Sequence, residues 1–107
     1  MEITQTGILE VNLQNKSETV SVKEDEQIEK IVKALSSRTR RQILHQIQEE
    51  PMDVSNIAAS LSMTEANISA QIKKLDEAGL ITCDYASGDH GVRKISKLKF
   101  NKLVIEF

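Results

Sequence analysis

Two short amphipathic segments, separated by about three residues, constrain this chain more than any other feature of its sequence. The first begins after Asp53, and its apolar residues recur at the spacing i, i+3, i+4, i+7 that puts side chains on one face of a helix. These residues are Val54, Ile57, Ala58 and Leu61. The carboxylate of Asp53 stands where it can accept hydrogen bonds from the free N–H groups of the first turn. The pattern predicts a short helix that Asp53 caps.

The second amphipathic segment begins at Thr64, after Ser62 and Met63 interrupt the pattern. Its apolar face consists of Ile68, Ile72 and Leu75. Thr64 occupies the N-cap position, and Gly79 stands where a residue with positive φ ends a helix. Leu80 then falls where it packs back on the last turn. The segment 64–78 is therefore predicted to be the longer helix of the pair.

A short helix, a tight turn and a longer polar helix are typical of a helix-turn-helix, in which the second helix enters the major groove of DNA. A plain helical hairpin that packs in the core and binds nothing has the same spacing. The two segments alone do not separate these interpretations, so the rest of the chain has to provide the context.

Length and cysteine content set the broad class. A chain of 107 residues is long enough for one domain, and with only 3% aromatic residues its core must be aliphatic. The single cysteine, Cys83, excludes an internal disulfide and fits a reducing compartment. The sequence has no long apolar run, so we expect neither a signal peptide nor a membrane span, and a cytoplasmic location.

Charge is distributed unevenly, although the formal net charge is only −2. Residues 1–35 carry four basic and seven acidic groups, a balance of −3, and residues 36–85 carry five and seven, a balance of −2. Residues 86–107 carry five basic and two acidic groups, a balance of +3. A partner made of phosphates is therefore expected to meet local basic patches and not the whole surface.

Residues 1–24 are predicted to form an N-terminal β extension. Leu9, Val11 and Leu13 alternate with polar residues, and so do Val20 and Val22. The polar run 14–17 between them indicates a hairpin. A lone hairpin is marginally stable in water, so this one is expected to pack on the domain formed by residues 25–107 or to take part in dimerisation.

The segment 24–35 is predicted to be a helix with one apolar stripe. The stripe consists of Ile28, Ile31, Val32 and Leu35. Either the whole stripe packs in the core, or part of it packs against a second copy of the chain. The second alternative arises because a small domain with this much apolar surface can bury some of it in a homodimer interface.

The segment 36–50 is predicted to be a further helix, capped by Ser36 or Ser37 and ended near Pro51, with Ile43, Leu44 and Ile47 facing inward. Its first turns hold Arg38, Arg40 and Arg41, where positive charge is mildly unfavourable against the helix dipole. Arginines in that position suggest phosphate contact, and a merely solvated face is the alternative.

The segments 80–85 and 92–98 read as strands around a turn at 86–91. A hairpin directly after a recognition helix is the wing of a winged helix, and its second strand carries Arg93, Lys94 and Lys97. The tail from 99 onward keeps alternating after a break near 101–102, and its last strand is expected to pair with the first hairpin or with a partner chain. The predicted fold class is mainly α with small β (α+β), a winged helix-turn-helix with an N-terminal β-hairpin and a C-terminal strand.

The run 33–80 resembles the ArsR-type winged-helix repressors, especially the small archaeal members. The matching pieces are Leu35-x-x-Arg38-x-Arg40-x-x-Ile43-Leu44, Ile57-Ala58, Leu61, Ile68-Ser69, and Leu75 followed by Glu77-Ala78-Gly79-Leu80. The resemblance implies a homodimer that binds a palindromic operator through its second motif helix.

Carried over by position, the DNA-contacting face of the family falls on Thr64, Glu65, Ala66, Asn67, Ser69, Ala70 and Gln71. Three features depart from the family pattern. The carboxylate of Glu65 stands where a neutral polar residue is common, Ala66 and Ala70 cannot hydrogen-bond a base, and Gln71 replaces a frequent histidine. The amide of Gln71 can still read an adenine edge. Lys73 and Lys74 are predicted phosphate contacts.

Metal sensing does not carry over from the family. The first motif helix has no cysteine, and the thiol of Cys83 with Asp89 and His90 is a poor set for zinc, which usually takes four ligands. We therefore expect no metal and no cofactor. No small-molecule effector is evident from the sequence, and any effector pocket would have to lie at a dimer interface.

The sequence thus predicts a homodimeric, sequence-specific double-stranded DNA-binding transcriptional regulator, a repressor by resemblance, with helix 64–78 in the major groove and wing 80–98 on the adjacent backbone or groove. The predicted DNA-binding residues are Arg38, Arg40, Thr64, Asn67, Ser69, Gln71, Lys73, Lys74, Arg93 and Lys94. The alternative is a winged-helix module that binds protein through its β-edges and does not read DNA. An enzyme is not expected, because no nucleophile–base or metal constellation is visible.

Overall fold

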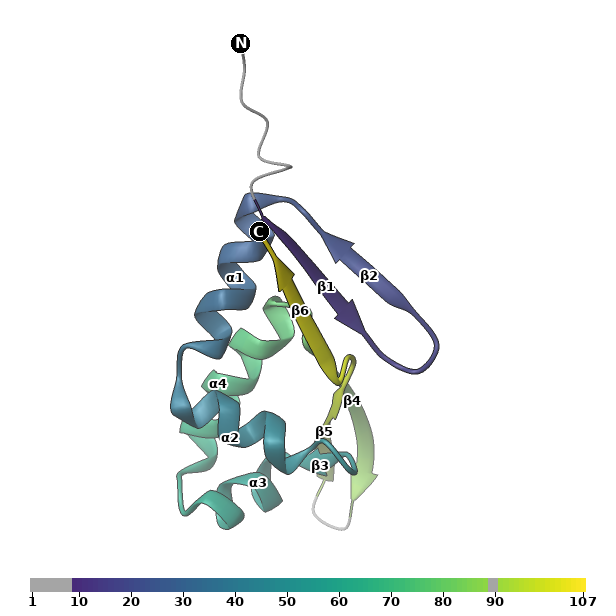
Figure 1. Cartoon of the computed structure of the whole chain (residues 1–107). Coiled ribbons are helices and arrows are strands. Elements are labelled where there is room, and N and C mark those ends of the chain that lie inside the picture. Colours follow the sequence, from purple (N-terminus) through teal and green to yellow (C-terminus); the bar gives the residue numbers. More distant parts are fainter. Residues whose placement is uncertain (1–8, 89–90) are drawn as a thin grey trace.

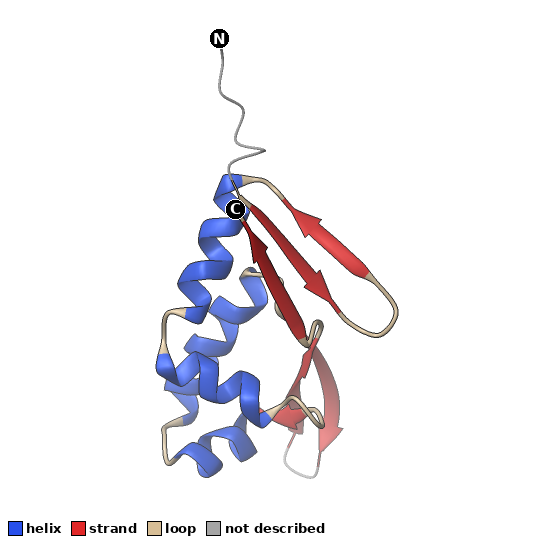
Figure 2. Cartoon of the chain, in the orientation of Figure 1, coloured by secondary structure: helices blue, strands red, loops and turns tan. Residues whose placement is uncertain are grey.

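Helices on one side and two small antiparallel sheets on the other make up the computed structural model, which describes residues 9–88 and 91–107 (Figure 1, Figure 2). The helices of the described part are α1 (Asp25–Leu35), α2 (Arg38–Gln46), α3 (Val54–Leu61) and α4 (Glu65–Glu77). The strands are β1 (Glu10–Gln14), β2 (Thr19–Val22), β3 (Met52–Asp53), β4 (Ile81–Gly88), β5 (Gly91–Leu98) and β6 (Lys102–Glu106). The α+β winged helix-turn-helix predicted from the sequence is confirmed.

Side-chain caps start three of the helices where the sequence places them. The carboxylate of Asp53 accepts from the backbone N–H of Asn56 at 2.8 Å, and the hydroxyl of Thr64 accepts from the N–H of Asn67 at 3.1 Å. Ser37, and not Ser36, caps α2. Each bond satisfies an N–H group that has no partner inside its own helix.

The end of α4 also follows the prediction. Gly79 has a φ of +78°, and the N–H of Leu80 reaches back to the carbonyl of Leu75 at 3.2 Å. This is the Schellman arrangement, which satisfies a terminal carbonyl and brings the next apolar residue onto the last turn. Leu80 and Leu75 are both buried, so the helix end is fixed by packing as well as by the hydrogen bond.

One aliphatic core joins the helices to both sheets. Its fully buried side chains include Val11, Ile31, Ile43, Ile57, Ile68, Ile72, Leu75 and Ile81. The residues come from both sheets and from all four of the described helices, so the fold is held together as a single unit. This interior is aliphatic apart from Phe100, in keeping with the low aromatic content.

The structure refines two helix predictions. Val32, which the sequence places on the apolar stripe of α1 and assigns either to the core or to contact with a second copy, is 47% exposed, because α1 is rotated so that Ile31 lies at the centre of the buried stripe with Ile28 and Ala34 beside it. Helix α2 ends at Gln46, short of the predicted residue 50, because the chain must leave the helix to form β3, which pairs with β5.

The terminal sheet has the strand order β2-β1-β6, all antiparallel. The predicted hairpin is therefore confirmed, and the last strand pairs with the first within one chain, in the register Val11↔Ile105 and Leu13↔Leu103. One sheet face carries these apolar residues, while the other carries hydrogen-bonded polar side chains such as Asn12 and Ser21. Figure 1 shows this sheet beside α1, at the end of the molecule away from α3.

The second sheet has the order β3-β5-β4 and forms the wing. Its strands β4 and β5 pair from Ile81↔Leu98 out to Gly88↔Gly91, so they extend further into the predicted 86–91 turn than expected. Asp89 and His90, which were considered from the sequence as zinc ligands together with Cys83, lie outside the described residues. A Cβ at Gly88 would lie 2.7 Å from Cδ of Arg93, so a larger residue there would require the Arg93 side chain to shift. None of the helices in the described ranges combines the length and the apolarity that a membrane span requires.

Candidate nucleic-acid interface

Helix α4 has one face anchored in the core and one open to solvent. Ile68, Ile72 and Leu75 are each 0% exposed, which fixes the orientation of the helix. Of the site residues predicted on this helix, Asn67, Ser69, Lys73 and Lys74 are exposed and Gln71 is half-buried. The terminal sheet does not cover the first turns of α4, which lie next to α3 at the other end of the molecule (Figure 2).

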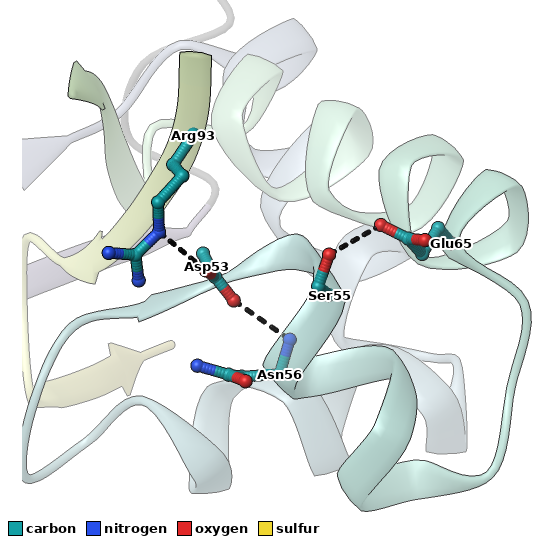
Figure 3. A network of polar contacts seen from close by, with 5 residues as sticks. All are labelled: Asp53, Ser55, Asn56, Glu65 and Arg93. Atoms are coloured by element: carbon teal, nitrogen blue, oxygen red, sulfur yellow. Dashed lines mark hydrogen bonds and ion pairs between the residues drawn. The ribbon is translucent and has the colours of Figure 1, made fainter. Parts of the chain in front are cut away.

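Glu65 is held by a hydroxyl from the neighbouring helix. Ser55 Oγ on α3 donates to Glu65 Oε1 at 2.6 Å, and Figure 3 shows the carboxylate directed toward α3. The acidic residue that departs from the family pattern is thus engaged at the contact between the two motif helices. Thr64, next to it, uses its hydroxyl as the N-cap of α4.

Arg40 binds several groups of the protein itself. Its Nε donates to the carbonyl of Ala34 and its Nη2 to that of Lys33, both at 2.8 Å, while Nη1 donates to Gln71 Oε1 at 2.7 Å. Arg41 donates to the carbonyl of Leu35 at 2.8 Å. These carbonyls belong to the last turn of α1, where carbonyl groups have no hydrogen-bond partner within the helix and the helix dipole favours a cation.

The position of the arginines in the first turns of α2 therefore has a local explanation: they cap the preceding helix. Arg38, in contrast, is exposed to solvent. The sequence presents all three as unfavourably placed cations but does not reveal the end of α1 as the partner of Arg40 and Arg41. That partner depends on the tight connection at residues 36–37, which brings the two helices together.

The wing is fastened to the start of α3 by an ion pair. Arg93 Nε lies 2.7 Å from Asp53 Oδ2, while Oδ1 of the same carboxylate accepts from Asn56 (Figure 3). The backbone bond from Asn56 lowers the pKa of Asp53, partial burial opposes the shift, and Arg93 adds to the lowering. About half of the Arg93 side chain (48%) remains exposed.

An open cleft of about 810 Å³ separates the wing from the first turns of α3 and α4. Its lining is mostly polar and comprises Asp53, Val54, Ser55, Asn56, Glu65, Ser69, Ser87, Gly88, Gly91, Val92, Arg93 and Lys94. The predicted residues Ser69, Arg93 and Lys94 therefore share one concave surface. Ser55 and Asn56 also lie there, and the sequence did not single them out, because only the fold brings α3 next to the wing.

Metal-ligating side chains do not gather in the part of the chain that the structure describes, where no group of three or more His, Cys, Asp or Glu residues could hold an ion. Cys83 on β4 is half-buried, with Sγ 3.7 Å from Ser96 Oγ on β5. The cysteine is thus a packing residue between two wing strands.

Residues 37–82 match the family model of the bacterial regulatory proteins of the arsR family. No curated protein sequence matches the chain significantly. The matched segment begins at the cap of α2 and ends in the first wing strand, so it includes both helices of the motif.

Solved structures also resemble the chain. An NMR structure from Mycobacterium bovis, described as the homodimeric winged helix-turn-helix DNA-binding domain of a possible ArsR-family transcriptional regulator, is 26% identical, with a TM-score of 0.61 over 68% of this chain and 64% of that chain. A crystal structure described as an ArsR family transcriptional regulator is 27% identical, with a TM-score of 0.58 over 68% of this chain and 76% of that chain.

HlyU from Vibrio cholerae in its reduced form shares the fold, with 18% identity and a TM-score of 0.59 over 68% of this chain and 73% of that chain. Motif, wing, family match and structural likeness agree. The chain has the winged helix-turn-helix fold, its residues 37–82 match the arsR family model, and it is similar to the DNA-binding domains of ArsR-family transcriptional regulators.

Proposed function

We propose that this chain is a homodimeric, sequence-specific regulator that binds double-stranded DNA and represses transcription. The recognition helix, residues 64–78, lies in the major groove, and the wing, residues 80–98, rests on the adjacent backbone. The observation that carries the proposal is the two-sided character of α4: Ile68, Ile72 and Leu75 fix it in the core while its polar side is open to solvent.

Base contacts and phosphate contacts fall to different residues. Asn67, Ser69 and Gln71 carry short polar groups on the first turns of α4, the part that reaches base edges in a helix-turn-helix. The flanking cations make phosphate contacts, which position the protein without reading sequence. These cations are Arg38, Lys73, Lys74, Arg93 and Lys94.

The negative net charge is compatible with this function because the basic residues are local. The wing strand β5 carries Arg93 and Lys94 on the cleft and Lys97 further along the strand, and Glu65 at the same cleft is engaged by Ser55. A phosphate backbone in the cleft therefore meets cations on one wall and an already bonded carboxylate on the other.

The homodimer is supported by one of the similar structures, which is described as homodimeric. Two copies related by a two-fold axis place their recognition helices about 34 Å apart, in successive major grooves, and so read a palindrome. Val32 on α1 and Ile105 on β6 are exposed apolar side chains that a second copy can cover.

The test is an unbiased selection of duplexes from a random pool, followed by gel-shift titration at low and moderate salt. The proposal expects a palindromic consensus and affinity that falls as salt rises. Failure to retain any duplex at low salt would count decisively against it. A reporter with the selected site at its promoter then distinguishes a repressor from an activator.

A second candidate function rests on the terminal sheet. Strands β2 and β6 are its edges in the described part of the chain, and Ile105 and Phe107 on the β6 side are exposed. Open edges pair with other strands, so the chain could act as a protein interaction module instead. Capture of a defined partner that is unaffected by Lys94→Ala and Asn67→Ala, with no duplex binding, supports that function.

A further inference from the structure

We propose that Arg40 is a positioning residue that fixes the direction of the Gln71 and Asn67 amides, so that α4 presents N–H donors to DNA and selects guanine. The inference rests on the proposed function, because it concerns the base that α4 reads. It assigns Arg40 a role different from the phosphate contact that the sequence suggested.

The guanidinium of Arg40 is held at the end of α1. Nε and Nη2 donate to the carbonyls of Ala34 and Lys33, both at 2.8 Å, and the side chain is half-buried. Two bonds from a planar group fix its plane, and therefore fix the direction in which the third nitrogen points. That nitrogen, Nη1, lies 2.7 Å from Gln71 Oε1 on α4.

The hydrogen bond from Arg40 to Gln71 determines which atom donates and which accepts in the next contacts along α4. A guanidinium has donors and no acceptor, so Gln71 must turn its oxygen toward Arg40 and its NH₂ away. The NH₂ of Gln71 then donates to Asn67 Oδ1 at 3.1 Å. Asn67 must in turn direct its own NH₂ outward, where the contact is Met63 Sδ at 3.7 Å, a weak acceptor.

Each amide oxygen on this face thus already accepts one hydrogen bond from the protein, which occupies one of its two lone pairs and directs it toward its partner, whereas the NH₂ groups keep N–H bonds available for a ligand. A glutamine or asparagine reads adenine with its oxygen and its NH₂ together. Guanine offers two acceptors, N7 and O6, and no donor on its major-groove edge. A face of donors therefore matches guanine, in place of the adenine contact that the sequence suggested for Gln71.

The decisive experiment compares duplex selection by the full chain and by two matched variants, Arg40→Lys and Arg41→Lys. Both keep the charge and both disturb an arginine bond to the end of α1, but only Arg40 contacts Gln71. We expect the wild-type chain and Arg41→Lys to select guanine at one fixed position of each half-site. Arg40→Lys should lose roughly tenfold in preference for guanine over adenine there, with its salt dependence unchanged.

A second variant covers the case in which Arg40→Lys fails to fold. Gln71→Glu keeps an acceptor for Arg40 but removes the N–H that Asn67 accepts, with almost no change in shape. It should lose the same guanine preference. In the unbound protein, the side-chain amide NMR signals of Asn67 and Gln71 should shift in Arg40→Lys and stay in place in Arg41→Lys.

The outcomes separate this inference from the proposed function. Adenine at the selected position, or an unchanged preference in Arg40→Lys, overturns the inference while DNA binding stands. A uniform loss of affinity with a flatter salt slope makes Arg40 a phosphate contact and also overturns it. If the wild-type chain binds no duplex, the proposed function and the guanine readout both fail.

Discussion

Arg93 on the wing and Asp53 at the start of α3 form an ion pair with Nε and Oδ2 2.7 Å apart, and this contact joins the two parts of the molecule that flank the cleft. The same carboxylate caps α3 through Asn56. A single residue therefore fixes both the beginning of the first motif helix and the position of the wing relative to it.

Separating the two roles of Asp53 gives the first prediction. Asparagine caps helices about as well as aspartate but cannot form the ion pair, whereas alanine does neither. We expect Asp53→Ala to lower the free energy of unfolding by about 1 kcal/mol, as for other lost caps, and Asp53→Asn to lower it much less. Denaturant titration measures both. Equal losses in the two variants would show that the cap is not what Asp53 supplies.

The lowered pKa of Asp53 gives the second prediction, for acid stability. A carboxyl group whose pKa is lower in the folded than in the unfolded chain stabilises the fold above the unfolded pKa, and that contribution disappears as pH falls through the folded pKa. Stability should therefore fall below about pH 4. Melting curves at several pH values should show a weaker acid dependence in Asp53→Asn than in the wild type.

Gly79 supplies the third prediction. Its φ of +78° is unfavourable for any residue with a Cβ, although the space is open, since the nearest atom to an added Cβ is Gln27 Nε2 at 3.8 Å. Gly79→Ala should therefore cost about 1 kcal/mol through backbone strain alone. Thermal unfolding measures the loss. Gly79→Asn, which tolerates this conformation better, is the matched variant and should recover part of the stability.

The fourth prediction concerns the dependence of duplex affinity on salt concentration. Lys94 lies on the wall of the cleft and is assigned to phosphate, so Lys94→Ala should weaken binding to all duplexes alike. The slope of log affinity against log salt should fall by about 0.9. Asn67→Ala should instead relax sequence preference and leave the slope unchanged. Titrations at three salt concentrations on two duplexes separate these effects, and a sequence-dependent loss in Lys94→Ala would contradict the assignment.

Local signals in the sequence were sufficient to place the helices and to predict the caps at Asp53 and Thr64 and the helix end at Gly79. Asp53, Thr64 and Gly79 act through their immediate neighbours, so their roles follow from spacing alone. The rotation of α1 did not follow, because Val32 and Ala34 are both acceptable on an inward face and only the packing partner decides between them. Tertiary packing overrides such local patterns.

The contacts around the site were harder to foresee, because they join distant elements. Arg40 meets Gln71 only when α2 packs beside α4, and Arg93 meets Asp53 only when β5 pairs with β3. A strand as short as β3 leaves no periodic signal. The sequence selects the polar residues of the proposed interface, and the fold shows which of them bind one another.

The pairing of β1 with β6 bears on the order in which the chain acquires its structure. The ribosome releases β1 long before its neighbour on the other side, Lys102–Glu106, has been made. A two-stranded hairpin is marginal in water, so its apolar face waits for later elements before it is secured. The helical motif, whose contacts are closer in sequence, is expected to mature first. The terminal sheet is then expected to close after the helical motif has formed, once β6 is available to pair with β1.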